Sequence, residues 1–126
     1  MSIKQTLMKY FGNHAETRDK HWDASLQTHY YKTTKDKALL KLEELYTNKQ
    51  NYSIQAISKE HGEISMYYKK TFIIITVISV RPYNTAIDFS VTTETILPFD
   101  FGNSTRRIEQ LYQQINKELP YIKTTN

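Results

Sequence analysis

Cysteine is absent from this sequence of 126 residues, and glycine and proline occur only three times each. Without cysteine the chain has no disulfide, no cysteine-ligated zinc site and no thiol nucleophile. The glycines stand alone, at positions 12, 62 and 102, so the chain has neither a glycine-rich phosphate loop nor a G-x-S-x-G serine turn. These absences exclude several common enzyme classes.

Long apolar runs and a strong charge of one sign are also missing. No run approaches the roughly 20 residues of a membrane-spanning helix, and residues 1–12 lack the uninterrupted apolar region of a signal peptide. The net charge is +4 with both signs interspersed, which is weaker than the concentrated charge of most nucleic-acid-binding domains. We therefore expect a single cytoplasmic domain with no membrane span and no strong nucleic-acid signal.

The most informative stretch is residues 71–96, which favours a long β-hairpin. Residues 72–78 are almost entirely β-branched, and such side chains suit a pleated sheet. Pro82, Tyr83 and Asn84 are expected to form a three-residue loop. That loop would pair Arg81 with Thr85, Val77 with Phe89, and Ile75 with Val91.

Alternation along this hairpin divides its side chains between two faces. The first face is a predicted core, formed by Ile73, Ile75, Val77, Ile87, Phe89 and Val91. The second face is half apolar, and it carries Phe72, Ile74, Ile78, Val80, Ala86, Asp88, Ser90 and Thr92. Such a face is unusual for an antiparallel sheet open to water, so something should cover it. In the expected register Asp88 lies opposite Ile78 and would be the polar group of any pocket there.

Two hypotheses for what covers the second face remain. One is the N-terminal segment, residues 1–27, predicted as a short amphipathic helix over residues 2–11 and a polar tether anchored by Trp22. Its apolar groups are Ile3, Leu7, Tyr10, Phe11 and Trp22. The other cover is the same face of a second molecule, which would make the protein a homodimer. We favour the N-terminal segment.

The rest of the chain predicts an α+β fold. A strand over residues 28–32, a helix over 34–48 and a hairpin of 52–58 with 63–68 precede the long hairpin. A last helix follows, with Asn103 or Ser104 as N-cap and Pro120 at its end. Both helices carry single apolar stripes, so we expect a two-layer sandwich with about five antiparallel strands and both helices on one face. The domain covers residues 28–120, and residues 121–126 form a flexible tail.

Catalytic and metal-binding patterns are weak. His14, His21 and His29 with Asp23 could ligate a metal, but their spacing matches no known ligand set. Asp88 and Glu94 lie six residues apart on one strand, roughly 20 Å, which is too far for shared acid–base work. We predict no catalytic residue, no metal and no cofactor, and an enzyme stays open only with a site that the sequence does not reveal.

Basic and aromatic residues offer an alternative. Tyrosine pairs precede lysine in residues 30–32 and 67–70, where rings and charges could bind single-stranded nucleic acid, although alternation more simply buries one ring of each pair. Arg106 and Arg107 lie in the first turn of the last helix, where acids are preferred. Their expected partner is Asp100, Glu109 or a bound anion. A membrane-surface role for residues 2–11, through Lys4 and Lys9, is a further alternative.

One segment carries a resemblance. Residues 98–115, PFDFGNSTRRIEQLYQQI, resemble an uncharacterised bacterial family with an Asp-x-Gly turn before an arginine-bearing terminal helix, matched here at Asp100, Gly102, Arg107 and Ile108. The whole chain looks like small cytosolic proteins of unknown function in low-GC Gram-positive bacteria. The resemblance implies a fold and a location, and no catalytic residues.

Together these observations predict a non-enzymatic binding or protein-interaction module. Its partner is expected to be a second copy of the chain or another protein, with weak binding of single-stranded nucleic acid or another polyanion as the alternative. The candidate ligand or interface residues are Asp88, Ile78, Arg81, Arg106 and Arg107.

Overall fold

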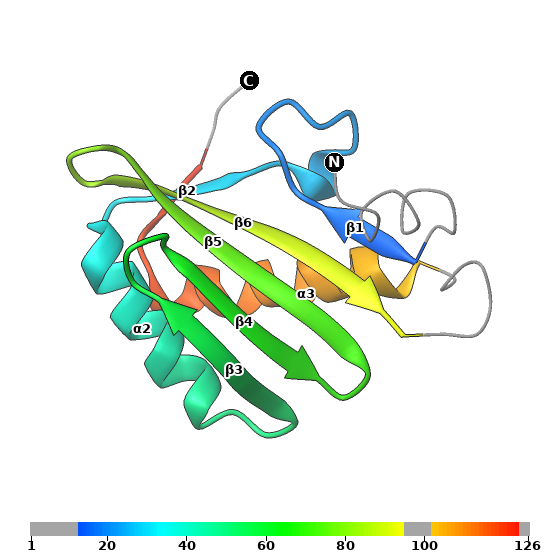
Figure 1. Cartoon of the computed structure of the whole chain (residues 1–126). Coiled ribbons are helices and arrows are strands. Elements are labelled where there is room, and N and C mark those ends of the chain that lie inside the picture. Colours follow the sequence, from blue (N-terminus) through cyan, green and yellow to red (C-terminus); the bar gives the residue numbers. More distant parts are fainter. Residues whose placement is uncertain (1–12, 95–101, 124–126) are drawn as a thin grey trace.

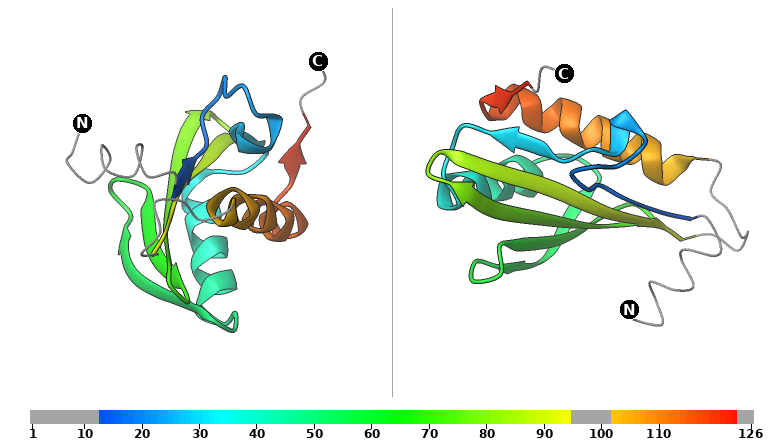
Figure 2. Two further views of the ribbon diagram at one scale, coloured as in Figure 1. Left: turned by 90° about the vertical axis from the view of Figure 1, so that its right-hand side faces the viewer. Right: turned by 90° about the horizontal axis from the view of Figure 1, so that it is seen from above.

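A computed structural model describes residues 13–94 and 102–123 of the chain. Its described part is an α+β fold, an antiparallel sheet of seven strands with two long helices on one face (Figures 1 and 2). The strands are β1 (His14–Glu16), β2 (His29–Tyr31), β3 (Tyr52–Ser58), β4 (Glu63–Tyr68), β5 (Thr71–Arg81), β6 (Asn84–Thr93) and β7 (Tyr121–Ile122). The helices are α2 (Lys35–Thr47), α3 (Asn103–Glu118) and the 3-10 turn η1 (Ala24–Leu26).

The strand order is β3-β4-β5-β6-β2-β7, and β1 pairs with β6 beside β2. The α+β class, the antiparallel sheet and the two helices are confirmed, but the expected count of about five strands is wrong. The two additional strands, β1 and β7, have three and two residues, too few to show a period of two in the sequence. β7 lies in the predicted tail, and the predicted helix over residues 2–11 lies outside the described residues.

The core lies between the sheet and the two helices. All six residues of the predicted first face are at most 2% exposed, and they meet the buried stripes of both helices. The α2 stripe is Ala38, Leu39, Leu42 and Tyr46, and the α3 stripe is Ile108, Leu111, Tyr112 and Ile115. The helical and strand periods in the sequence therefore identified the main core correctly.

The register of the long hairpin differs from the expected one by two residues. Val77 lies opposite Ile87 where Phe89 was expected, and Ile75 lies opposite Phe89. Only Pro82 and Tyr83 stand between the strands, and a bulge between Ser79 and Arg81 takes up an extra residue. Because the shift is even, the side chains of residues 72–79 and 84–92 keep their predicted faces, whereas Arg81, beyond the bulge, lies opposite Asn84 and not opposite Thr85 as expected.

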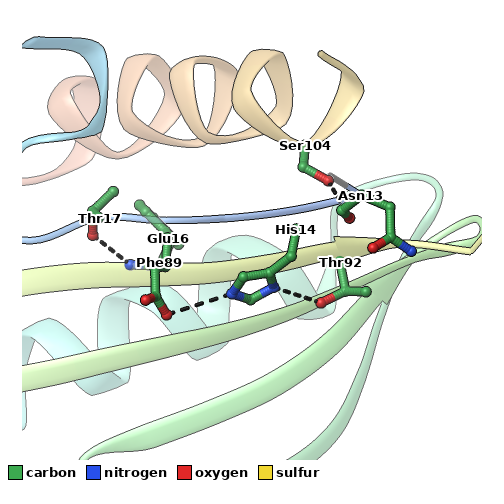
Figure 3. Close-up of polar contacts among 7 residues, drawn as sticks. All are labelled: Asn13, His14, Glu16, Thr17, Phe89, Thr92 and Ser104. Atoms are coloured by element: carbon green, nitrogen blue, oxygen red, sulfur yellow. Dashed lines mark hydrogen bonds and ion pairs between the residues drawn. The ribbon is translucent and has the colours of Figure 1, made fainter. Parts of the chain in front are cut away.

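Hydrogen bonds from the first described residues fasten β1 to the end of β6 and to α3 (Figure 3). Phe89 N donates to Thr17 Oγ1 at 2.9 Å, and His14 Nδ1 lies 2.8 Å from Thr92 Oγ1. Ser104 Oγ donates to Asn13 O at 3.0 Å. The N-cap of α3 is Gly102, so the prediction of Asn103 or Ser104 as N-cap is wrong. Ser104 is instead a buried link between that helix and Asn13, the residue before β1.

The second face is partly exposed. Ile78 and Val80 are 49% and 50% exposed, whereas Ile74 is half-buried. Trp22, the predicted anchor of the N-terminal tether, is 84% exposed and lies 5.6 Å from the ring of His21. Trp22 therefore does not cover the sheet, and the prediction that it anchors the segment is wrong.

Candidate anion-binding groove

Two adjoining hollows, about 480 and 460 Å³, lie where the β4–β5 turn, the start of α3 and the loop after α2 meet. They share Tyr68, Arg107 and Gln110, so they form one groove. The first hollow adds Lys69, Lys70, Thr71, Thr93, Asn103 and Arg106. The second adds Asn48, Lys49, Gln50, Asn51, Tyr52 and Gln114.

Local structure explains why these groups meet. Alternation along β4 places Tyr68 on the helix-covered face, at the end of the strand next to α3. The tight β4–β5 turn then exposes both of its lysines, with Lys69 at a φ of 52°. Lys49 follows the end of α2, in the loop that leads to β3. Turn residues and one helix face therefore line the groove.

Arg107 is held over an aromatic ring at the centre of the groove. Its guanidinium carbon lies 3.7 Å from the centroid of Tyr68, and Lys69 Nζ lies 5.5 Å from the same centroid. Tyr52 packs against Tyr68 with ring centroids 4.8 Å apart. Arg107 also donates to the side-chain oxygen of Gln110. Cation–π contact and this hydrogen bond orient the guanidinium plane.

Tyrosine and glutamine side chains behind Tyr52 support this arrangement. The ring of buried Tyr46 lies 4.9 Å from that of Tyr52, and Tyr46 donates to Gln114 Oε1 at 2.9 Å. Burial raises the pKa of Tyr46 well above its ordinary value of 10, whereas the positive charge of Arg107 lowers it. The phenol stays neutral at physiological pH and serves as a hydrogen-bond donor.

The groove gathers the positive charges of Lys49, Lys69, Lys70, Arg106 and Arg107. Among the described residues, neither hollow is lined by a carboxylate, and the ion pairs His14–Glu16 and Lys41–Glu118 lie outside the groove. The N-cap of α3 is Gly102, which makes no side-chain cap, and the first turn carries no acid. Helix dipole and cations therefore favour a negative charge at the same place.

The residues proposed from sequence fall into separate places. Arg106 and Arg107 line the groove, and Arg106 donates to Asn103 Oδ1 at 2.5 Å. Arg81 lies at the exposed tip of the long hairpin, opposite Asn84. The predicted partner Asp100 lies outside the described residues.

Asp88 and Ile78 are not opposite each other on the second face, as was expected. Asp88 lies opposite Thr76, and Ile78 lies opposite Ala86, because of the two-residue shift in register. The carboxylate of Asp88 accepts hydrogen bonds from two threonine hydroxyls and thereby has a structural role (see Discussion).

Sequence reasoning missed several groove residues, namely Lys49, Tyr52, Gln110 and Gln114. Lys49 and Tyr52 lie more than 50 residues from α3 in the chain, so no motif could join them to it. The signal that was present is the tyrosine–lysine run of residues 67–70. Its rings do point to opposite faces, and Tyr67 packs against Phe72 on the second face with centroids 5.1 Å apart.

The histidines are not gathered into a metal site. No group of three histidine, cysteine or acidic side chains suited to a metal occurs in residues 13–94 and 102–123. His29 is instead stacked between Tyr112 and Tyr121, with ring centroids 3.5 and 4.5 Å away. Its Nδ1 lies 3.4 Å from Asn116 Oδ1, which also accepts from the hydroxyl of Tyr31 at 2.6 Å.

Stability should fall in mild acid because of His29. Burial lowers the pKa of His29 below its ordinary value of 6.5, although Asn116 and Asp88 raise it. The unfolded chain therefore takes up the proton first, and stability is lost as the pH falls below about 6.5 through the folded-state pKa. Thermal melts at neutral and mildly acidic pH should show this loss. His29→Phe, which keeps a stacking ring without a titrating group, should have a smaller pH dependence than the parent. Equal pH dependence in the two proteins would contradict the assignment.

Comparison with protein families, curated proteins and solved structures gives no match to this chain. The resemblance of residues 98–115 to an uncharacterised bacterial family thus stays a prediction. Among the described residues, no helix has the length and apolar character needed to cross a membrane.

Proposed function

We propose that this protein is a non-enzymatic binding module that takes an extended anionic chain, single-stranded nucleic acid, in the groove around Tyr68 and Arg107. The observation that carries the proposal is the groove itself, whose described lining has cations, amides and tyrosine rings and no carboxylate. Lysine and arginine neutralise phosphates, and amide side chains can bond to phosphate or base.

The arrangement suits a polymer better than a single small anion. Arg107 lies at the junction of the two hollows, with Lys69 and Lys70 on one side and Lys49 on the other. Successive phosphates of one strand could therefore meet successive cations. A guanidinium plane held against an aromatic ring can also stack a base on its outer side, and such contacts tolerate any sequence.

Binding of a labelled oligothymidylate of about fifteen nucleotides, followed by fluorescence anisotropy across a range of salt, tests the proposal. Arg107→Gln should weaken binding about tenfold at low salt and reduce the slope of log Kd against log salt by about 0.7, the value for one lost single-strand phosphate contact. The double variant Lys69→Gln, Lys70→Gln should reduce the slope by about twice as much.

The matched control is Arg81→Gln, which removes the same charge at the exposed tip of the long hairpin. This variant should change the affinity less than twofold. If Arg81→Gln weakens binding as much as Arg107→Gln, the attraction is a property of net charge and the groove is not the site. Heparin that binds as tightly as the oligonucleotide would show that base stacking contributes nothing.

A further inference from the structure

A second surface of this protein lies at the opposite side of the fold from β7, along β3. β3 is the last strand of the sheet at that edge, and it pairs only with β4 among the described strands. Figure 1 shows α2 running beside it. Apart from a bond from Tyr52 N to Lys49 O at 3.3 Å, no described backbone group outside β4 bonds to the backbone of β3.

The edge has little of the protection that usually prevents strand addition. Natural edge strands are shortened, charged, bulged or interrupted by proline. β3 has seven residues, YSIQAIS, none of them charged and none of them proline, and its single safeguard is a bulge between Ile54 and Ala56. An uncharged strand of this length can accept another strand.

An apolar hollow of about 300 Å³ adjoins this strand. It lies between α2 and the far end of β3, and its lining is Asp36, Leu39, Leu40, Glu43, Ile57 and Lys59. The bulge returns Ile57 to the helix-covered face, so that it points toward α2. Leu40 is 59% exposed and lines the hollow, so it offers apolar surface to a ligand there. The volume suits one or two large apolar side chains.

The charges of the hollow indicate the kind of occupant. Asp36 and Glu43 both line it from α2, about two helical turns apart, and neither is in an ion pair with a described residue. Lys59 adds one positive charge, so the two carboxylates leave the described lining with a net negative charge. A ligand that buries an apolar side chain between these carboxylates would bind more tightly if it carried lysine or arginine beside that side chain.

From these observations we propose that β3 and α2 form a docking site for an extended peptide segment of a partner protein. The segment adds to the sheet as a strand beside β3, and its backbone bonds to the outer groups of that strand. One apolar side chain enters the hollow against Leu40 and Ile57, and basic residues on either side pair with Asp36 and Glu43. The hollow of this site shares no residue with the anion-binding groove, and Tyr52, at the start of β3, is the residue of that strand that also lines the groove.

A synthetic peptide of alternating lysine and threonine with one central leucine is the probe. Because the peptide is basic, the cationic groove repels it. Titration followed by amide chemical shifts in NMR should shift β3 and α2 resonances, and exchange of the central leucine for serine should weaken binding at least fivefold. Leu40→Glu should weaken binding about tenfold. Because Leu40 is exposed, the variant should fold, and the same spectra check that it does.

The contribution of the acidic residues is tested with Glu43→Gln. The matched control is Glu44→Gln, on the exposed side of α2 outside the hollow. Of these two variants, only Glu43→Gln should weaken binding of the peptide, by about threefold. Three results would overturn the proposal: unshifted β3 amides at millimolar peptide, equal binding of the serine peptide, or equal effects of the two glutamine variants. A dimer in light scattering that Leu40→Glu converts to a monomer would instead assign the edge to a second copy of the chain.

Discussion

Replacing Asp88 with alanine should lower the free energy of unfolding by about 3 kcal/mol, because its carboxylate holds two separate segments against β6. Thr17 and Thr28 each donate a hydroxyl hydrogen bond of 2.6 Å to the same oxygen, Asp88 Oδ1. Hydrogen bonds to a charged group contribute about 1.5–3 kcal/mol each, and a buried hydroxyl without its acceptor is costly. Thr17 is 7% exposed, so water cannot easily replace the lost acceptor.

Thermal and urea unfolding would measure this loss, expected as a decrease in Tm of about 10 °C. Asp88→Asn is the matched variant, because its amide oxygen still accepts from both hydroxyls while the charge is gone. It should retain more than half of the lost stability. Asp88→Ala with an unchanged Tm would show that the carboxylate does not hold Thr17 and Thr28 against β6.

Replacing Gly62 with alanine should be at least as damaging, on the order of 3 kcal/mol. Gly62 lies in the β3–β4 turn with a φ of 69°, a conformation that costs a residue with a Cβ about 1–2 kcal/mol. An added Cβ would also lie 2.3 Å from the carbonyl oxygen of Val77, far inside van der Waals contact. Val77 N donates to Gly62 O at 2.7 Å, so the turn cannot retreat without losing a backbone hydrogen bond.

Gly102→Ala is the graded control for this prediction. Gly102 has a similar φ of 79°, but among the described residues an added Cβ there would meet only the side chain of Arg106, at 3.2 Å. Because that side chain is flexible, Gly102→Ala should cost about 1–2 kcal/mol, the backbone penalty alone. Chemical denaturation of the two variants in parallel provides the test. Equal losses would show that the contact with Val77 contributes nothing.

Asp88 also shows why a plausible ligand residue can turn out to have a structural role. From sequence it was a polar group on a half-apolar sheet face, opposite Ile78. In the fold it lies opposite Thr76 and is satisfied by threonines that come from 71 and 60 residues away in the chain. Sequence patterns report which face a side chain occupies, and they do not report which distant hydroxyls reach it.

The groove illustrates the same limit. The notable position of Arg106 and Arg107 in the first turn of a helix was visible in the sequence, because the helix dipole disfavours cations there. The meeting of Arg107 with Tyr68, Tyr52 and Lys49 depends on how the ends of α2 and β4 lie relative to the start of α3.

The sequence by itself determined the α+β class, both helices with their buried stripes, both hairpins and the two faces of the long one. These features depend on local periods of 3.6 and 2.0, which a stretch of ten residues displays in full. The tertiary structure alone decided the register, the bulge next to Arg81, the pairing of β1 and β7 and the assembly of the groove. Each of these depends on contacts between residues far apart in the chain, and a two-residue strand or a shift by two leaves the local pattern unchanged.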